Sequence, residues 1–305
     1  MFIVSPRVGL CNQLQTIVKG VLLGIKYNRN IYIDRFQINL HDGNTCDINE
    51  ILNISNINQY LSSKNISIKI LSEIDTNIIN NISEFKLPYL DYSTIEYSHY
   101  INNFIEDNLN MEVIYLGNVI SLCIHKSFNY IYGDYSNLYH LIMSNIVFND
   151  KFYQMKTEIK KNLNLINYTS IHLRVEDDFV KHCSEYLNIN LNEYNNQLLL
   201  NYDIHIKNIT TNMYVCSGIL NYDNTLNYDY YINLRSRHKL LCDKSNLYID
   251  DYILKNRELI AIIDLLIAYD SDEFIGHKFS SFSTVIQNYL ICIKQIDEKN
   301  IHLIQ

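Results

Sequence analysis

The stretch Tyr168–Asp178 reads Tyr-Thr-Ser-Ile-His-Leu-Arg-Val-Glu-Asp-Asp, and the rest of the chain can be interpreted from it. It begins as a short apolar run typical of a β-strand and ends in Arg174 followed by three carboxylates. Such an ending suits the carboxyl edge of a parallel sheet, where α/β proteins bind ligands. Because a guanidinium is always charged and its fork matches phosphate oxygens, Arg174 predicts an anion site. The competing interpretation is a structural ion-pair network of Arg174 with Glu176, Asp177 and Asp178.

The second half of the chain alternates between strand and helix patterns. Apolar runs predict strands at Tyr168–Leu173, Asn212–Cys216, Leu247–Ile249 and Glu273–Ile275, and helices at Leu191–Tyr202, Asn256–Tyr269 and Phe282–Ile293. This alternation indicates a Rossmann-like sheet with helices on its faces.

The first half begins with a second unit of the same kind. A strand at Phe2–Val4, a loop with Gly9, a helix with apolar residues from Leu14 to Ile25 and a strand at Ile31–Ile33 form a βαβ pattern. Further along, the patterns predict short helices in Asp47–Leu61, strands at Asn65–Leu71 and Val113–Leu116, and helices at Leu138–Phe148 and Asp150–Leu163. Residues 75–110 give mixed signals. The expected architecture is therefore α/β, with two Rossmann-like domains, 1–155 and 156–305, facing each other across a cleft.

Composition and charge exclude several classes of protein. The 305 residues carry a net charge of -8, which argues against a general nucleic-acid-binding protein. The seven cysteines include no Cys-x-x-Cys pair, so reduced thiols fit better than a disulfide framework or a zinc site. No signal peptide is apparent, and the longest apolar run, Leu259–Tyr269, is too short to span a membrane. We therefore expect a cytoplasmic protein without a membrane span, in a host cytoplasm or virion if the gene is viral.

Three loops follow predicted strands and combine into one chemical set. They are Gly9–Gln13, His172–Asp178 and Gly276–Ser283, and the last begins a helix with a pair of serines. A cation, an amide side chain and a helix amino end with hydroxyls together suit a diphosphate. Taken alone, each loop has a simpler interpretation, since Ser280 or Ser281 could serve only as a helix cap.

These loops resemble the motifs of the GDP-fucose-dependent protein O-fucosyltransferases and their α-1,6-fucosyltransferase relatives. His-Leu-Arg-Val-Glu-Asp-Asp is similar to the family's His-x-Arg-x-x-x-Asp motif, and Gly9-Leu-Cys-Asn-Gln13 to its amino-terminal Gly-x-x-Asn-Gln. Ile260–Thr284 resembles the carboxyl-terminal motif, and Tyr214–Gly218 a family strand that ends in a small residue and glycine. The motifs occur in the family's order.

The resemblance implies a GT-B fold and an inverting, metal-independent transfer of fucose from GDP-fucose, with no cofactor. It assigns catalytic roles to Arg174, on the diphosphate, and Asn12, on the β-phosphate and fucose. The remaining residues that it implies in donor binding are Gly9, Cys11, Gln13, His172, Asp178, Asp264, Ser280, Ser281 and Phe282. His172 is expected near the nucleoside, Asp264 on the nucleoside, and Asp178 beside Arg174.

Several points stay open at this stage. The general base is unassigned, with Glu176 a candidate only through proximity, and the acceptor is a glycan or protein hydroxyl. His277 stands where relatives often carry asparagine, so the donor could be another GDP-, UDP- or dTDP-deoxysugar. A nucleotide- or carbohydrate-binding protein without turnover is the alternative from outside the enzymes.

Overall fold

The computed structural model describes residues 1–305 except 40–41, 75–94, 118–135, 222–225 and 246. Backbone contacts divide the chain into an N-terminal unit, Met1–Asn149, and a C-terminal unit, Asp150–Gln305. The predicted boundary near residue 155 falls inside helix α7 (Asp150–Asn162), which packs as one piece against helix α12 (Arg257–Ala268) of the C-terminal unit.

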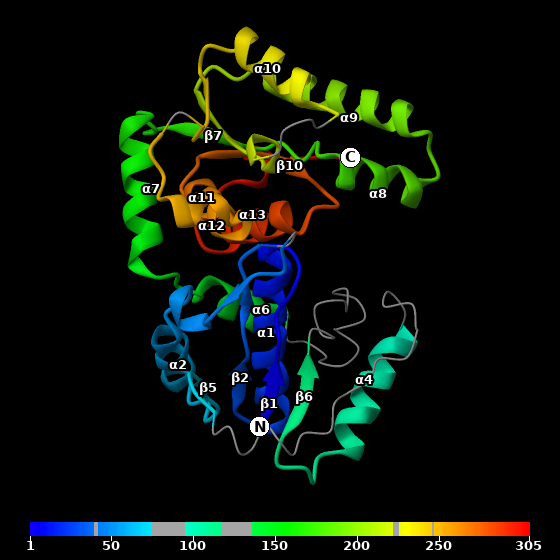
Figure 1. Ribbon diagram of the computed structural model, residues 1–305, viewed down its shortest axis with the longest axis vertical. Helices are drawn as coiled ribbons and strands as arrows, with labels where there is room; N and C mark the ends of the chain where they lie inside the picture. The colour runs from blue at the N-terminus through cyan, green and yellow to red at the C-terminus, as the bar shows by residue number, and fades with distance from the viewer. Residues whose placement is uncertain (40–41, 75–94, 118–135, 222–225, 246) are drawn as a thin grey trace. The chain divides into compact units, whose positions relative to one another are not determined.

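The N-terminal unit is built on a parallel sheet of strand order β5-β2-β1-β6 (Figure 1). Its strands are β1 (Phe2–Val4), β2 (Ile31–Ile33), β5 (Ile70–Leu71) and β6 (Ile114–Gly117). Helix α1 (Leu10–Tyr27) follows β1 and buries Leu14, Ile17 and Val21 against the sheet, which confirms the βαβ prediction. The unit also contains the hairpin β3 (Phe36–Gln37) and β4 (Thr45–Cys46), the 3-10 helix η1 (Ile48–Glu50), and helices α2 (Ile54–Ser63), α4 (Ile95–Asp107) and α6 (Ser136–Ser144).

Two predicted elements of this unit are shorter than expected. Only Ile70–Leu71 of the expected strand at Asn65–Leu71 pairs with a neighbour, and Asn65 forms a left-handed turn after α2. The helix expected at Leu138–Phe148 ends at Ser144, and Phe148 instead bridges Leu52. Most of the ambiguous region 75–110 lies outside the described residues.

The C-terminal unit contains a five-stranded parallel sheet of order β11-β10-β7-β8-β9. Its strands are β7 (Tyr168–His172), β8 (Asn212–Cys216), β9 (Leu241–Cys242), β10 (Glu273–His277) and β11 (Ile301–Ile304). β7 pairs with β8 through five residues, from Tyr168 opposite Asn212 to His172 opposite Cys216, so the two strands end together.

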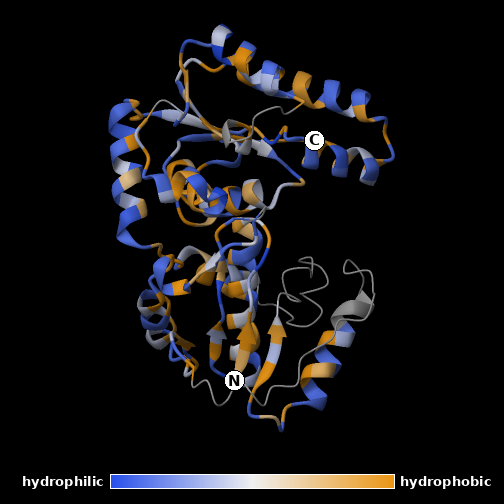
Figure 2. Cartoon of the chain, in the orientation of Figure 1, coloured by the Kyte–Doolittle hydropathy of each residue, from blue (hydrophilic) through white to orange (hydrophobic). Residues whose placement is uncertain are grey.

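Helices cover both faces of this sheet, as expected for a Rossmann-like unit (Figure 1). Helices α8 (Asp177–Leu187), α9 (Leu191–Ile206) and α10 (Tyr228–Arg237) share one core with Ile171 and Val215. The other face carries α7, α12 and α13 (Ser281–Cys292), together with the short α11 (Asp251–Lys255). Figure 2 shows that α12 is mostly hydrophobic whereas α7 is mostly hydrophilic, as their different burial requires.

Alternate residues of β7 point to these two faces. Ile171 packs in the core with α8 and α9, whereas the Tyr168 hydroxyl donates to the Ile267 carbonyl of α12. His172 reaches Ser283 of α13 on that second face. Because successive side chains of a strand point to opposite faces of the sheet, His172 points toward the loop Gly276–Ser283.

One strand prediction for this unit is wrong, and several of its elements were not predicted. The prediction of a strand at Leu247–Ile249 is wrong. The segment that pairs with β8 is β9, with Leu241 opposite Met213, and Tyr248 is exposed. Helix α8 was not predicted, because its acidic first turn resembled a charged loop. Strand β11 and helices α10 and α11 were also not predicted. Across the described ranges, no helix combines the length and the apolar character that crossing a bilayer requires.

Candidate active site at the carboxyl edge of the C-terminal sheet

Adjacent parallel strands bring three chain segments to one edge of the C-terminal sheet. β10, β7 and β8 are neighbours, and all three run in the same direction. Their carboxyl ends are followed by the turn into α13, by Arg174, and by Ser217–Gly218 respectively. The expected meeting of the second and third loops is therefore observed within this unit.

Arg174 is held by two carboxylates that differ in exposure. Its Nη1 lies 2.8 Å from Glu176 Oε2, and its Nη2 lies 3.0 Å from Asp178 Oδ2. The Glu176 side chain is 5% exposed, whereas that of Asp178 is 60% exposed. The predicted pairing of Arg174 with Glu176 and Asp178 is thus present, whereas Asp177 accepts from the Leu226 N–H instead.

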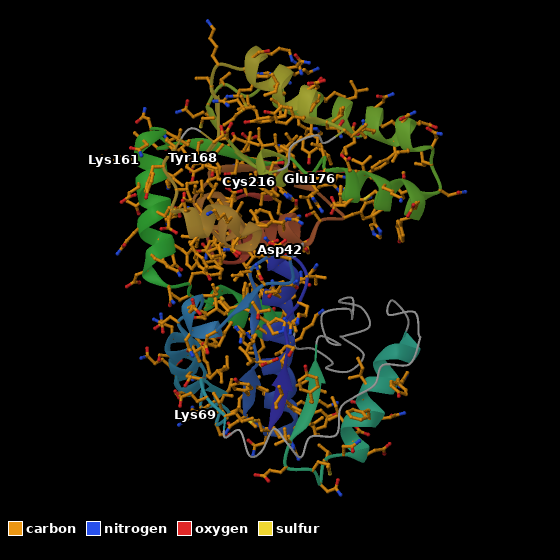
Figure 3. All side chains as sticks on the ribbon, viewed as in Figure 1. Asp42, Lys69, Lys161, Tyr168, Glu176 and Cys216 are labelled. Atoms are coloured by element: carbon orange, nitrogen blue, oxygen red, sulfur yellow. The ribbon has the colours of Figure 1, made fainter. Side chains whose placement is uncertain are left out.

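Glu176 connects Arg174 to the neighbouring strand. Its Oε1 accepts hydrogen bonds from the Gly218 N–H (2.7 Å) and the Ser217 hydroxyl (3.4 Å). Figure 3 shows Glu176 near Cys216, the residue that precedes this turn. One oxygen of this buried carboxylate pairs with Arg174 and the other accepts from the Gly218 N–H. These contacts suit a residue that positions the guanidinium better than a general base for the sugar acceptor.

The backbone and the aliphatic stem of Arg174 are also supported. The Tyr202 hydroxyl donates to the His172 carbonyl (2.7 Å) and accepts from the Arg174 N–H (3.0 Å). The guanidinium carbon lies 5.0 Å from the ring centre of Phe179, a cation–π distance. Burial opposes the charge of Arg174, but Glu176 and Asp178 outweigh burial and raise its pKa.

The first turn of α13 presents donors beside this cation. Ser280 is the N-cap residue, yet its side chain makes no capping hydrogen bond, so the cap-only interpretation does not describe it. Within the part of the chain that the structure describes, the N–H groups of Ser281, Phe282 and Ser283 have no protein acceptor. A helix amino end with free N–H groups favours an anion.

His172 and Ser283 fix the position of this turn. His172 Nδ1 lies 2.8 Å from the Ser283 hydroxyl, which in turn accepts from the His277 N–H at 2.9 Å. The His172 ring packs on Phe282 with centres 4.6 Å apart. Burial, together with the charge of Arg174, holds the pKa of His172 well below its usual value, so its imidazole is neutral.

Gly276 and His277 allow the turn to approach the sheet closely. A Cβ at Gly276 would lie 2.6 Å from the Ser283 hydroxyl and 2.7 Å from the Phe274 ring, so only glycine fits. His277 is fully buried, with Nδ1 accepting from the Phe279 N–H (3.2 Å) and Nε2 facing the Tyr194 hydroxyl (3.1 Å). Burial lowers the pKa of His277 to about 4.

Asp264 lies inside the unit and is already paired. Its Oδ2 lies 2.6 Å from Lys244 Nζ, and its Oδ1 accepts from the Tyr214 hydroxyl at 2.8 Å. Burial raises the pKa of Asp264, although Lys244 and Tyr214 act in the opposite direction. Its expected contact with a nucleoside stays a prediction.

The amino-terminal motif lies in the other unit, at the start of α1. Gly9 is the N-cap residue, and Asn12 is half-buried with no hydrogen-bond partner for its side chain among the described residues. Cys11 is buried, and the Gln13 amide is fully buried, where it bonds the backbone of Val8 and Gln37. Donor contacts of Gly9, Cys11 and Gln13 therefore stay predictions, with Gln13 in a structural position.

Sequence reasoning missed three residues that shape these sites. They are Tyr202, Gln37 and Lys244. Each acts on a partner at least 20 positions away in the chain, so no local pattern signals it. Across the described residues, no group of three or more His, Cys, Asp or Glu side chains has a geometry that could hold a metal ion.

Comparison with known proteins agrees with this geometry. The sequence model of the family described as "GDP-fucose protein O-fucosyltransferase" matches residues 46–290. The chain therefore belongs to this family of glycosyltransferases.

Solved structures give the fold class. A crystal structure of POFUT1 in complex with GDP is 12% identical, with a TM-score of 0.60, 99% of this chain covered and 97% of that one. Fucosyltransferase NodZ from Bradyrhizobium is 9% identical, with a TM-score of 0.54 and coverages of 94% and 91%. The fold is accordingly the GT-B class predicted from the motifs. No curated protein sequence matches significantly.

Proposed function

We propose that this protein is an inverting fucosyltransferase that uses GDP-fucose and needs no metal ion or other cofactor. The observation that carries the proposal is the partly buried, doubly paired Arg174 beside the free amino end of α13. Family membership supports the same donor class. POFUT1 has been crystallised with GDP-fucose. In that structure its sequence is 13% identical to this chain, and the TM-score is 0.52.

The chemistry follows from where negative charge develops. An acceptor hydroxyl oxygen attacks C1 of fucose as the bond from C1 to the phosphate oxygen breaks, and the electron pair leaves with the β-phosphate. The hydroxyl proton is lost to a base that is unassigned. Arg174 and the N–H groups of α13 are fixed before reaction, so they can stabilise the departing diphosphate more in the transition state than in the ground state.

Asn12 is proposed to assist at the same leaving group from the N-terminal unit. Its amide can donate a hydrogen bond to a phosphate or sugar oxygen, and no described protein group competes for it. The acceptor is proposed to be a hydroxyl of a glycan or protein.

Calorimetry and turnover test this proposal together. We expect GDP to bind more tightly than UDP or dTDP, and GDP-fucose to be consumed faster than other nucleotide sugars in a hydrolysis and transfer panel, in the presence of EDTA. Preference for a UDP- or dTDP-sugar would replace the donor assignment, and binding of GDP without any turnover would favour a binding protein.

A further inference from the structure

The loop before α1 contains a residue in an unusual backbone conformation. Val8 has a φ of 67°, in the left-handed region that L-residues avoid and that a β-branched side chain makes especially unfavourable. Such a conformation persists only where surrounding contacts impose it, and it is often found at functional sites.

Two glutamine side chains impose it. The Val8 N–H donates to Gln37 Oε1 at 2.8 Å, and the Val8 carbonyl accepts from Gln13 Nε2 at 2.8 Å. The two glutamines also bind each other's segments, because the Gln37 N–H donates to Gln13 Oε1 and Gln13 Nε2 donates to the Gln37 carbonyl, both at 2.8 Å. Gln13 is 0% and Gln37 8% exposed, so the two bonds between these glutamines are buried, and the two to Val8 are partly buried. We call this set the glutamine clamp.

The clamp holds the residue that directly precedes the N-cap residue of α1. Gly9 follows Val8 directly, and its carbonyl accepts from the N–H groups of Asn12 and Gln13. A Cβ at Gly9 would meet nothing within 4 Å, so tight packing around Gly9 does not account for the strained conformation next to it. We expect the conformation of Val8 to set the direction of the first turn of α1, and thereby the position of the half-buried Asn12.

We infer that Gln37 is a positioning residue for sugar transfer, which acts through Val8 on Asn12. The inference rests on the proposed function, because it takes Asn12 to contact the leaving group. Gln37 comes from the β3–β4 hairpin, outside the amino-terminal motif, and it supplies the acceptor for the Val8 N–H. The proposal therefore assigns the hairpin a role in the reaction beyond packing.

The test compares Gln37→Met, Val8→Gly and the double variant. Methionine keeps the length of the side chain but removes the amide oxygen, so the Val8 N–H loses its acceptor and only the bond from Gln13 to the Val8 carbonyl remains. We expect Gln37→Met to lower kcat for transfer at least tenfold while GDP affinity changes less than twofold, because GDP is proposed to bind the C-terminal unit. Glycine adopts positive φ without a steric penalty, so adding Val8→Gly should restore kcat at least threefold.

The kcat values of these variants decide whether Gln37 positions Asn12. Wild-type kcat in Gln37→Met, or no gain on adding Val8→Gly, would overturn the inference, as would failure of both Gln37→Met and the double variant to fold. A lower melting temperature with unchanged kcat would make the clamp purely structural. If the wild-type protein itself neither binds GDP nor turns over GDP-fucose, the proposed function fails instead. This outcome is distinct from failure of the Gln37 inference, which requires an active wild-type protein.

Discussion

At the residue scale, the guanidinium of Arg174 depends on Glu176. The carboxylate of Glu176 is buried and divides its oxygens between Arg174 and the Gly218 N–H. Asp178 makes the second ion pair from a mostly exposed position. Glu176 is thus the more permanent of the two supports.

Replacing Glu176 by glutamine tests this role. Glu176→Gln keeps an oxygen for Gly218 but loses the charge that holds Arg174. We expect kcat to fall about tenfold, less than the about 10²–10³ that loss of a direct donor costs, because Arg174 itself remains. Asp177→Asn is the matched control, since Asp177 accepts from the Leu226 N–H and has no bond to Arg174. Steady-state kinetics of the two variants check this expectation. Equal kinetics would show that Glu176 does not position Arg174.

The buried pair of Lys244 and Asp264 gives a second prediction at this scale. Their side chains are 3% and 6% exposed, so Lys244→Met leaves an unpaired carboxylate inside the protein. We expect a loss of about 3–5 kcal/mol in the free energy of unfolding, and a smaller loss in Lys244→Met/Asp264→Asn. Urea denaturation measures both. If the double variant is no more stable than the single one, the ion pair is not the cause.

At the scale of elements, β7 and β10 each end in a buried neutral histidine against α13. His172 contacts Ser283 through its ring, and the backbone N–H of His277 donates to the same hydroxyl. Protonation of either imidazole would place a charge in a buried site near Arg174, which the lowered pKa values of both residues reflect.

Acid should therefore destabilise this part of the fold. An unfolded histidine titrates near pH 6.5, whereas His277 in the folded unit titrates at about 4. The unfolded chain thus binds more protons in this window, so stability is complete above about pH 6.5 and falls as the pH is lowered. Each histidine contributes a slope of up to about 1.4 kcal/mol per pH unit.

Denaturation between pH 7 and pH 4.5, in the range of these shifts, measures that slope. His277→Asn should reduce the slope, with substitution of the exposed His182 as the control. A wild-type free energy of unfolding that stays constant across this range would contradict the expectation.

At the scale of the whole molecule, the sequence predicted the long elements and the chemistry that follows them. β7, β8 and α12 are continuous apolar runs, so their positions could be predicted within about two residues. Arg174 and the serines of α13 were found because charge or hydroxyls directly follow an apolar strand. β9 was missed because a strand of two residues has too little pattern to distinguish it from a loop, and β11 was also missed.

What the sequence could not provide is the set of long-range supports. Tyr202 joins Arg174 and His172 from α9, and Gln37 joins Val8 from a separate hairpin. These hydrogen bonds depend on how elements pack, and a tyrosine in a chain with 26 tyrosines carries no signal of its own. The residues proposed to contact the donor could thus be found from motifs, whereas those that position them depend on the packing of distant elements.

The most direct test of the central claim is the rate of fucose transfer from GDP-fucose by the wild-type protein and by Arg174→Ala, with Arg237→Ala as a control on an exposed arginine. We expect Arg174→Ala to lose at least about 10²–10³ in kcat, because it removes the cation proposed to stabilise the departing diphosphate. Arg237→Ala should retain wild-type activity. Transfer by Arg174→Ala at the wild-type rate would contradict the account.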